Sequence, residues 1–151
     1  MSTEVDAVIR TVEELREVVA PPNDAVAMKL GDTLDEHARD FIAECPFVVL
    51  ATASAEGRGD SSPKGDAPGF VLVEDDHTLV IPDRPGNNLA FGLTNILENP
   101  HVGLLFNNPG TTETLRVNGR AELTRDPDLL EELAARGKPA ILGIRVHVEE
   151  V

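Results

Sequence analysis

The stretch FVVLATA, residues 47–53, decides the fold class of this chain. It is a continuous apolar run rich in β-branched residues, with Pro46 before it and Glu56-Gly57 after it. A run of this length and composition predicts a buried strand. Glu56-Gly57 predicts a turn, so residues 58–64 are expected to form the paired strand, closed by Gly65-Asp66.

Further short strands are predicted toward the C-terminus. Two apolar segments, residues 69–73 and 78–81, flank four polar residues and predict a hairpin. Residues 102–106 and 141–148 each predict one more strand. The stretch TLRVNGRAEL, residues 114–123, alternates apolar and polar side chains. We therefore expect one face of that strand to carry Leu115, Val117, Ala121 and Leu123, and the opposite face to carry Arg116, Asn118, Arg120 and Glu122.

Helices are predicted at the start, in one crossover and near the end of the chain. Two capping boxes, Thr11 to Glu14 and Thr33 to Glu36, predict helices that end before Pro21 and near Cys45. Residues 87–98 and 127–137 predict two more. Because no strand–helix–strand repeat is sustained, we expect a mainly β (α+β) fold, an antiparallel barrel with peripheral helices. A length of 151 residues favours one domain over residues 1–151, with residues 1–33 as an N-terminal helical arm.

Composition excludes several classes of function. The net charge is −14, which disfavours nucleic-acid binding because a phosphate backbone requires a basic surface. No apolar run approaches the ~18–20 residues of a membrane span, and residues 1–10 lack the apolar region of a signal peptide. A single cysteine, Cys45, cannot form an internal disulfide. We therefore expect a cytoplasmic protein with no membrane contact.

The few basic residues of the central region lie in or beside turn and strand motifs. Residues 46–121 contain five of them: Arg58, Lys64, Arg84, Arg116 and Arg120. A solvated surface charge is the alternative interpretation for each. Their gathering in an otherwise acidic chain favours a site for one small anion.

Three segments could hold such an anion. Residues 61–66, SSPKGD, place two hydroxyls and a cation at a strand end. Residues 81–88, IPDRPGNN, lead from a strand through a tight turn into a predicted helix, whose free N–H groups could bind phosphate. Residues 109–120 place Arg116 and Arg120 on one strand face. A surface hairpin, helix capping and a polar outer face are the respective alternatives.

At these residues the chain resembles the pyridoxamine 5'-phosphate oxidase-like flavoproteins, in particular their small, poorly characterised branch. The resemblance covers residues 35–123 and rests on five segments in the family's order: residues 62–66, 68–71, 81–87, 99–106 and 113–121. It implies a split β-barrel that forms a homodimer, with FMN between the subunits and a small-molecule substrate.

The resemblance also implies roles for particular residues. Ser61, Ser62 and Lys64 on the strand would hold the phosphate and ribityl chain, together with Arg84, Asn87 and Asn88 on the turn. The segment that carries Thr112, Thr114 and Arg116 would approach the isoalloxazine. Many relatives have a further arginine where this chain has Leu89, which would remove one phosphate contact.

Two function classes follow from these residues. The first is an FMN-dependent oxidoreductase in which the flavin supplies the hydride chemistry, with no catalytic side chain assigned. The second is a non-catalytic protein that binds flavin, a deazaflavin or a tetrapyrrole on the same fold. The four histidines have no metal-ligand spacing, so we expect no metal site.

Overall fold

The computed structural model describes residues 7–151, and its internal contacts divide the chain after Leu30. The first unit contains two short helices, α1 (Val12–Val18) and α2 (Asp24–Ala27), and all of its described side chains are exposed. The Thr11 hydroxyl accepts a hydrogen bond from the Glu14 N–H at 3.1 Å, which confirms the predicted start of α1. Asn23 caps α2 in the same way, a helix that the sequence patterns did not indicate.

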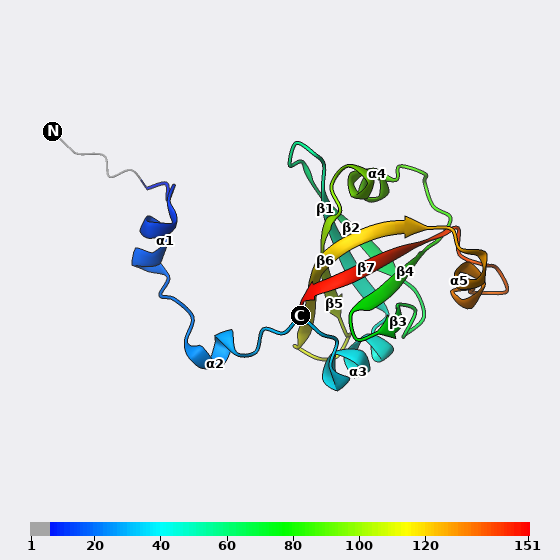
Figure 1. The fold of residues 1–151 in the computed structure, drawn as a ribbon, viewed down its shortest axis with the longest axis horizontal. Helices are drawn as coiled ribbons and strands as arrows, with labels where there is room; N and C mark the ends of the chain where they lie inside the picture. The colour runs from blue at the N-terminus through cyan, green and yellow to red at the C-terminus, as the bar shows by residue number, and fades with distance from the viewer. Residues whose placement is uncertain (1–6) are drawn as a thin grey trace. The chain divides into compact units, whose positions relative to one another are not determined.

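Residues 31–151 form a seven-stranded antiparallel sheet in the order β2-β1-β5-β6-β7-β4-β3 (Figure 1). The edge strands β2 and β3 are not paired with each other, so the barrel is open along one side. This confirms the predicted fold class, an α+β split barrel. The strands are β1 (Phe47–Ala53), β2 (Gly59–Gly65), β3 (Leu72–Asp75), β4 (Thr78–Asp83), β5 (His101–Asn107), β6 (Thr114–Thr124) and β7 (Leu142–Glu150).

Three helices accompany this sheet: α3 (Glu36–Glu44), α4 (Phe91–Glu98) and α5 (Pro127–Glu132). The Asp35 carboxylate caps α3, accepting from the Ala38 N–H at 2.8 Å, so the cap lies two residues after the predicted Thr33. Ala38, Phe41 and Ile42 form an apolar stripe on α3 that is buried, which fixes the helix against the sheet. Helix α5 ends at Glu132 rather than near Gly137, and the chain then forms a separate tight turn in which Ala135 and Lys138 exchange backbone hydrogen bonds of 2.9 and 3.0 Å. No helix within residues 7–151 is long and apolar enough to cross a membrane.

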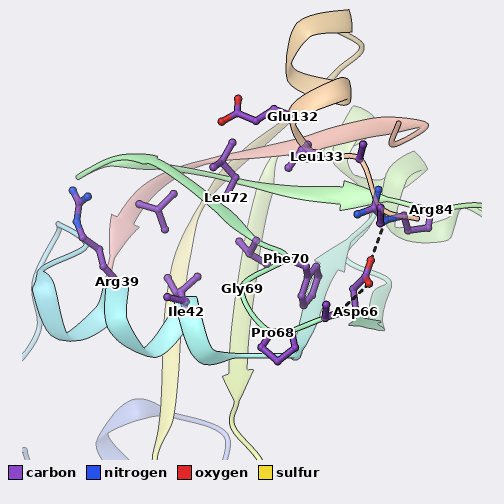
Figure 2. A pocket seen from close by; sticks show the side chains of 16 residues that line it. Arg39, Ile42, Asp66, Pro68, Gly69, Phe70, Leu72, Arg84, Glu132 and Leu133 are labelled. Atoms are coloured by element: carbon purple, nitrogen blue, oxygen red, sulfur yellow. Dashed lines mark hydrogen bonds and ion pairs between the residues drawn. The ribbon is translucent and has the colours of Figure 1, made fainter. Parts of the chain in front are cut away.

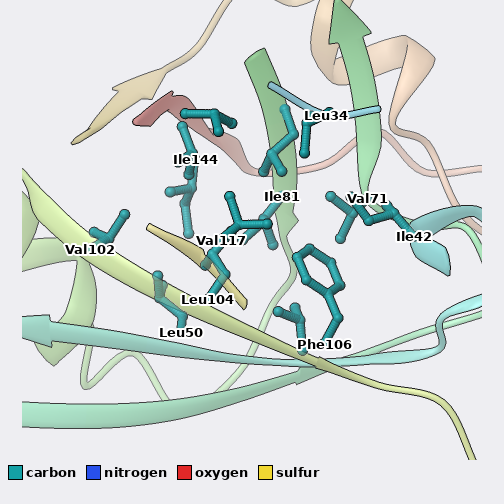
Figure 3. Packing of buried hydrophobic residues seen from close by; sticks show 14 of the residues in the cluster. Leu34, Ile42, Leu50, Val71, Ile81, Val102, Leu104, Phe106, Val117 and Ile144 are labelled. Atoms are coloured by element: carbon teal, nitrogen blue, oxygen red, sulfur yellow. The ribbon is translucent and has the colours of Figure 1, made fainter. Parts of the chain in front are cut away.

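The core fills the inside of the curved sheet (Figure 3). Phe106 and Leu104 of β5 are both buried in it: Phe106 is paired with Val48 of β1, and Leu104 is paired with Leu50 of β1 and Val117 of β6. The strand predicted over residues 47–53 is present as β1, and it is buried on one face. Val48 and Leu50 face the core while Ala51 is exposed, because an antiparallel sheet of this kind covers only one face.

The outer side of β2-β1-β5 carries few charges. Cross-strand pairing places Ala51 beside Ser61 and Gly103, and Val49 beside Pro63 and Leu105. Most of these side chains are exposed, and none is ionisable. We call Phe47, Val49, Ala51, Pro63 and Leu105 the apolar outer face.

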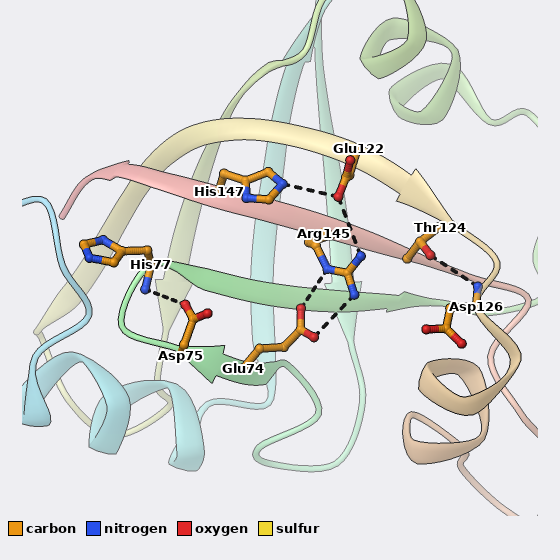
Figure 4. Close-up of polar contacts among 8 residues, drawn as sticks. All are labelled: Glu74, Asp75, His77, Glu122, Thr124, Asp126, Arg145 and His147. Carbon is orange, nitrogen blue, oxygen red and sulfur yellow. Dashed lines mark hydrogen bonds and ion pairs between the residues drawn. The ribbon is translucent and has the colours of Figure 1, made fainter.

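The outer side of β3-β4-β7 is covered in two ways. Helix α5 packs Leu129 and Leu133 over Val80 of β4. Beyond the helix, Arg145 of β7 donates to both carboxylate oxygens of Glu74, at 2.8 and 3.3 Å, and lies 3.6 Å from Glu122, which also contacts His147 (Figure 4). We call Glu74, Glu122, Arg145 and His147 the charged outer face. The hydrogen bonds that Arg145 donates to the Glu74 carboxylate raise the pKa of Arg145 above its usual value.

Candidate functional site

A cavity of about 450 Å³ lies at the opening of the barrel. Strands β2 and β4 line it, together with residues 84–90 and the first turn of α4. Because β2 and β4 are far apart in the sheet order, only the curvature of the sheet brings them to one site. Six of the nine predicted cofactor-binding residues line this cavity: Ser61, Ser62, Lys64, Arg84, Asn87 and Asn88.

Both cations of the cavity lie beside aspartates across the opening. The Lys64 ammonium on β2 is 3.6 Å from the Asp83 carboxylate at the end of β4. Arg84, which follows β4, donates from Nε to Oδ2 of Asp66, which follows β2, at 3.1 Å. In this second pair the cation therefore comes from the β4 side and the carboxylate from the β2 side. Lys64 and Arg84, predicted to bind an anion, each have a carboxylate partner that an incoming phosphate must share or displace.

Arg84 nevertheless has N–H donors that are not used in the ion pair with Asp66. A guanidinium has five N–H groups, and within residues 7–151 only Nε has a hydrogen-bond partner. Nη1 is buried and unpaired, a state that costs about 1–3 kcal/mol and that an anionic ligand would relieve. Lys64 likewise makes an ion pair without a hydrogen bond within the described chain. Both residues therefore suit a ligand with several acceptor oxygens.

Asp66 is held in its charged form. The Ala67 N–H, which donates to Asp66 Oδ1 at 2.8 Å, lowers the pKa of this carboxyl below its usual value, and Arg84 and Arg136 lower it further. Asp66 is therefore ionised at neutral pH and keeps Arg84 in place at the edge of the cavity.

The predicted helix start at Asn87 is wrong. Asn88 and Ala90 have positive φ angles of 61° and 53°, so the chain cannot enter a helix before Phe91. The Asn87 side chain accepts from the Leu89 N–H at 3.1 Å and stabilises a turn. Asn87 and Asn88 therefore reach the cavity from a loop that precedes α4.

Three apolar side chains line the same cavity without being covered. Leu89, Phe91 and Ile141 are 58%, 59% and 51% exposed. Leu89 lies before α4 and is exposed because the helix begins only at Phe91, whereas Leu93 and Ile96 of the helix face inward.

The other three predicted residues lie elsewhere. Thr114 and Arg116 are on β6 and Thr112 is in the loop before it, and none lines the cavity. Arg116 pairs with Leu105, so its exposed side chain borders the apolar outer face. The predicted cofactor-binding role of these three residues, like that of the six at the cavity, stays a prediction.

Sequence reasoning missed the acidic residues of the site. Asp66 and Asp83 lie inside the quoted motifs and Asp60 directly precedes the first of them, and Asp60 and Asp83 line the cavity. The available signal was an aspartate next to each cation: Asp83 precedes Arg84, and Asp66 follows Lys64 by two positions. The actual pairing is crossed, Lys64 with Asp83 and Arg84 with Asp66, which no local spacing indicates.

Within the described part of the chain, the cysteine and histidine side chains form no second candidate site. The buried Cys45 thiol donates to the backbone oxygens of Phe47 and Asn107, at 2.9 and 3.2 Å, and so has a structural role. Among residues 7–151, no group of histidine, cysteine, aspartate or glutamate side chains could hold a metal ion.

Residues 34–151 match the family profile described as pyridoxamine 5'-phosphate oxidase. The chain belongs to this family. The match includes every strand and the whole cavity, and excludes α1 and α2. The family assignment made from the sequence motifs is thereby confirmed. No curated protein matches the sequence.

Solved structures with the same fold support the assignment of the barrel. A putative pyridoxamine 5'-phosphate oxidase from Lactobacillus delbrueckii is 24% identical, with a TM-score of 0.61 over 80% of this chain and 93% of the other. An FMN-binding protein from Syntrophomonas wolfei is 11% identical, with a TM-score of 0.53 over 77% and 83%. An F420 reductase is 19% identical, with a TM-score of 0.50 over 73% and 90%. At these identities the likeness establishes that this family member shares their fold.

Proposed function

We propose that this protein binds FMN in the cavity between β2, β4 and α4, and that it is an FMN-dependent oxidoreductase. One observation carries the proposal: six residues expected from the family motifs meet on one cavity, and the guanidinium among them has a buried N–H without a partner. A cavity of about 450 Å³ lies within the range of small-molecule sites.

The residues present fit the two ends of FMN. Lys64 and Arg84 would bind the phosphate, and the Ser62 hydroxyl, on the same face of β2 as Lys64, would bind the phosphate or the ribityl chain, with Ser61 at the rim on the outer side. The exposed side chains of Leu89 and Phe91 offer an apolar surface for the ring system and would keep water from it. FMN, when bound, supplies hydride transfer, and this chain supplies position and electrostatics.

A second copy of the chain completes the proposed site. The apolar outer face lies on the same strands as Ser61 and Pro63, which also line the cavity. In a homodimer that buries this face, Thr112, Thr114 and Arg116 of one copy would approach the cavity of the other, as the family resemblance implies. Burial of an exposed, uncharged sheet surface would drive the association.

The flavin proposal is tested with the purified full-length protein. We expect it to show the visible absorption of flavin, or to acquire it on titration with FMN, and to release FMN on denaturation. A colourless protein that gains no FMN on titration would exclude the proposal. Arg58→Ala is the matched control for Arg84→Ala, because Arg58 is an exposed arginine that does not line the cavity.

Catalysis is tested separately from binding. If the protein is an oxidoreductase, NADH or NADPH should reduce the bound flavin under anaerobic conditions. Flavin that binds tightly but is reduced by neither would favour the alternative function, a non-catalytic flavin-binding protein.

A deazaflavin is the second candidate ligand, and Leu89 favours it. Family members often have an arginine here for the phosphate, and in this chain Asp60 and Asp83 add two carboxylates to the cavity wall. A cavity with a weakened phosphate site would hold its flavin as a loosely bound cosubstrate. A competition titration between FMN and F420 distinguishes the two, since the preferred ligand displaces the other at the lower concentration.

A further inference from the structure

A second cavity, of about 510 Å³, lies on the other side of Arg84 (Figure 2). Helix α3 forms one wall, residues 66–73 and β3 the next, and the end of α5 the third. Arg84 and Asp66 are at one end and Arg39 at the other. We call this cavity the α3–α5 cleft. Arg84 is the single predicted cofactor-binding residue that lines it.

The walls between these charged ends are mostly apolar, apart from Glu132 at the end of α5. Ile42 of α3, Phe70 before β3 and Leu133 after α5 line the middle of the cleft, and Leu72 closes it along the edge strand. Gly69 shapes the floor: its φ is +80°, and a Cβ atom there would lie 2.8 Å from the backbone oxygen of Ala43. Only glycine lets the chain pass this close to α3 and leave the cleft open.

The two charged ends differ in their unused donors. Arg39 is engaged twice, donating to the Leu34 backbone oxygen at 2.9 Å and pairing with Asp76. Arg84 has only the bond to Asp66, and its Nη1 is buried without a partner among the described residues. Arg136 also lowers the pKa of Asp66, so two arginines act on one carboxylate at this end. The open position at this end is the unpaired Nη1 of Arg84, which an acceptor oxygen of a ligand would satisfy.

We propose that the α3–α5 cleft binds a small monocarboxylate with an apolar tail, its head group on Arg84 and its tail between Ile42, Phe70 and Leu133. Charge and polarity select this class of ligand. A second negative charge on the ligand would meet the Asp66 and Glu132 carboxylates that also line the cleft, and a polar molecule would leave its hydroxyls unpaired against the apolar walls. A carboxylate accepts two hydrogen bonds from a guanidinium.

Sodium octanoate is the probe, titrated into the isotopically labelled full-length protein and followed by backbone-amide NMR. We expect a Kd on the order of 1 mM for a ligand of this size, with shifts centred on residues 67–72 and 132–135. Octanamide, the uncharged analogue, should bind at least about tenfold more weakly. The absence of shifts at ~10 mM octanoate, ten times the expected Kd, would overturn the proposal. Equal affinity for octanamide would overturn the role of the arginine.

Substitutions locate the site. Ala134 is exposed and lines the cleft, so Ala134→Trp should fill the opening and abolish octanoate binding. Ala55→Trp, at an exposed turn outside both cavities, is the matched control and should bind octanoate as the wild type does. If Ala134→Trp does not fold, Ala43→Trp fills the cleft from the α3 side. Unchanged octanoate binding in a folded cleft variant would place the ligand elsewhere.

The cleft and the flavin cavity share Arg84, so their ligands should compete for its donors; this coupling rests on the proposed function. We expect the Kd of FMN to rise about fivefold or more in saturating octanoate, and the Kd of octanoate to rise by the same factor in saturating FMN. An unchanged Kd of FMN would show that the carboxylate does not use Arg84. If the protein binds octanoate but no FMN, the flavin proposal alone is refuted. If Ala134→Trp binds FMN but no octanoate, the two ligands occupy separate sites.

Discussion

The two outer faces of the sheet are built differently although strands of one sheet form both. On the charged outer face, Arg145 joins Glu74 and Glu122 across strands, and α5 covers Val80 beside them. On the apolar outer face, Val49 and Ala51 lie beside Pro63, Ser61 and Leu105, and most of this surface stays exposed. The charged outer face is well solvated by water, whereas the apolar outer face is a candidate protein–protein interface.

The difference bears directly on the proposed site. The strand that closes the apolar outer face, β2, also carries Ser61 and Lys64 of the flavin cavity. Arg116 borders this face as well. Association through it would therefore bring residues of a second copy to the cavity, while the charged outer face would remain in solvent. Four variants test this division, in order of decreasing effect.

Ala51→Arg places a charge at the centre of the apolar outer face. We expect it to raise the dimer dissociation constant at least about 100-fold, because the cation would be buried without a partner, and to abolish FMN binding with it. Sedimentation velocity measures the dissociation, and circular dichroism checks the fold. Ala55→Arg, at an exposed turn, is the control. A variant that remains dimeric would show that the interface lies elsewhere, and a monomeric wild type would exclude the dimer.

Arg84→Ala removes the guanidinium at the cavity. FMN binding should weaken by about 1.5–3 kcal/mol, the effect of a lost charge-assisted hydrogen bond to phosphate. Fluorescence titration of FMN against this variant and against Arg58→Ala measures the difference. Equal affinities would mean that the phosphate lies away from Arg84, although the dimer could still form.

Arg145→Met tests the charged outer face. Arg145 is the shared partner of two carboxylates, so we expect the free energy of unfolding to fall by about 1 kcal/mol, with dimerisation and FMN binding unchanged. Urea denaturation at low and high salt measures this, and the difference should shrink at high salt because exposed charges are screened. A loss of dimer in this variant would contradict the proposed division of the two faces.

Asp66→Asn has the smallest expected effect, under about 1 kcal/mol, because the ion pair is partly exposed. The pKa of Asp66 is lowered in the folded state. Its contribution to stability is therefore present above its ordinary pKa of 3.8 and is lost as the pH falls through the lower folded value. Urea denaturation at about pH 5 should show wild type more stable than the variant, and the difference should disappear at strongly acidic pH. A difference that persists or grows in acid would contradict the assigned ionisation.

Most of the fold could be predicted because its signals are local. The alternation of residues 114–123 fixed which side chains of β6 face the core: Val117 and Ala121 are buried, while Arg116 and Arg120 are exposed. The positions of the strands follow from turns such as Glu56-Gly57, where Gly57 has a φ of +83°. The start of α4 was missed because left-handed backbones at Asn88 and Ala90 leave no clear mark in the sequence.

The sequence by itself determined seven strands, the inner face of β6 and the family, because strand period, turn chemistry and motif order depend on neighbouring residues. Tertiary structure alone decided how the site is charged. Arg84 meets Asp66, and Lys64 meets Asp83, across the opening of the barrel, where two strands that share no hydrogen bonds face each other. The α3–α5 cleft also arises only when α3, β3 and α5 come together. Such contacts depend on how the sheet curves, and no local pattern encodes that curvature.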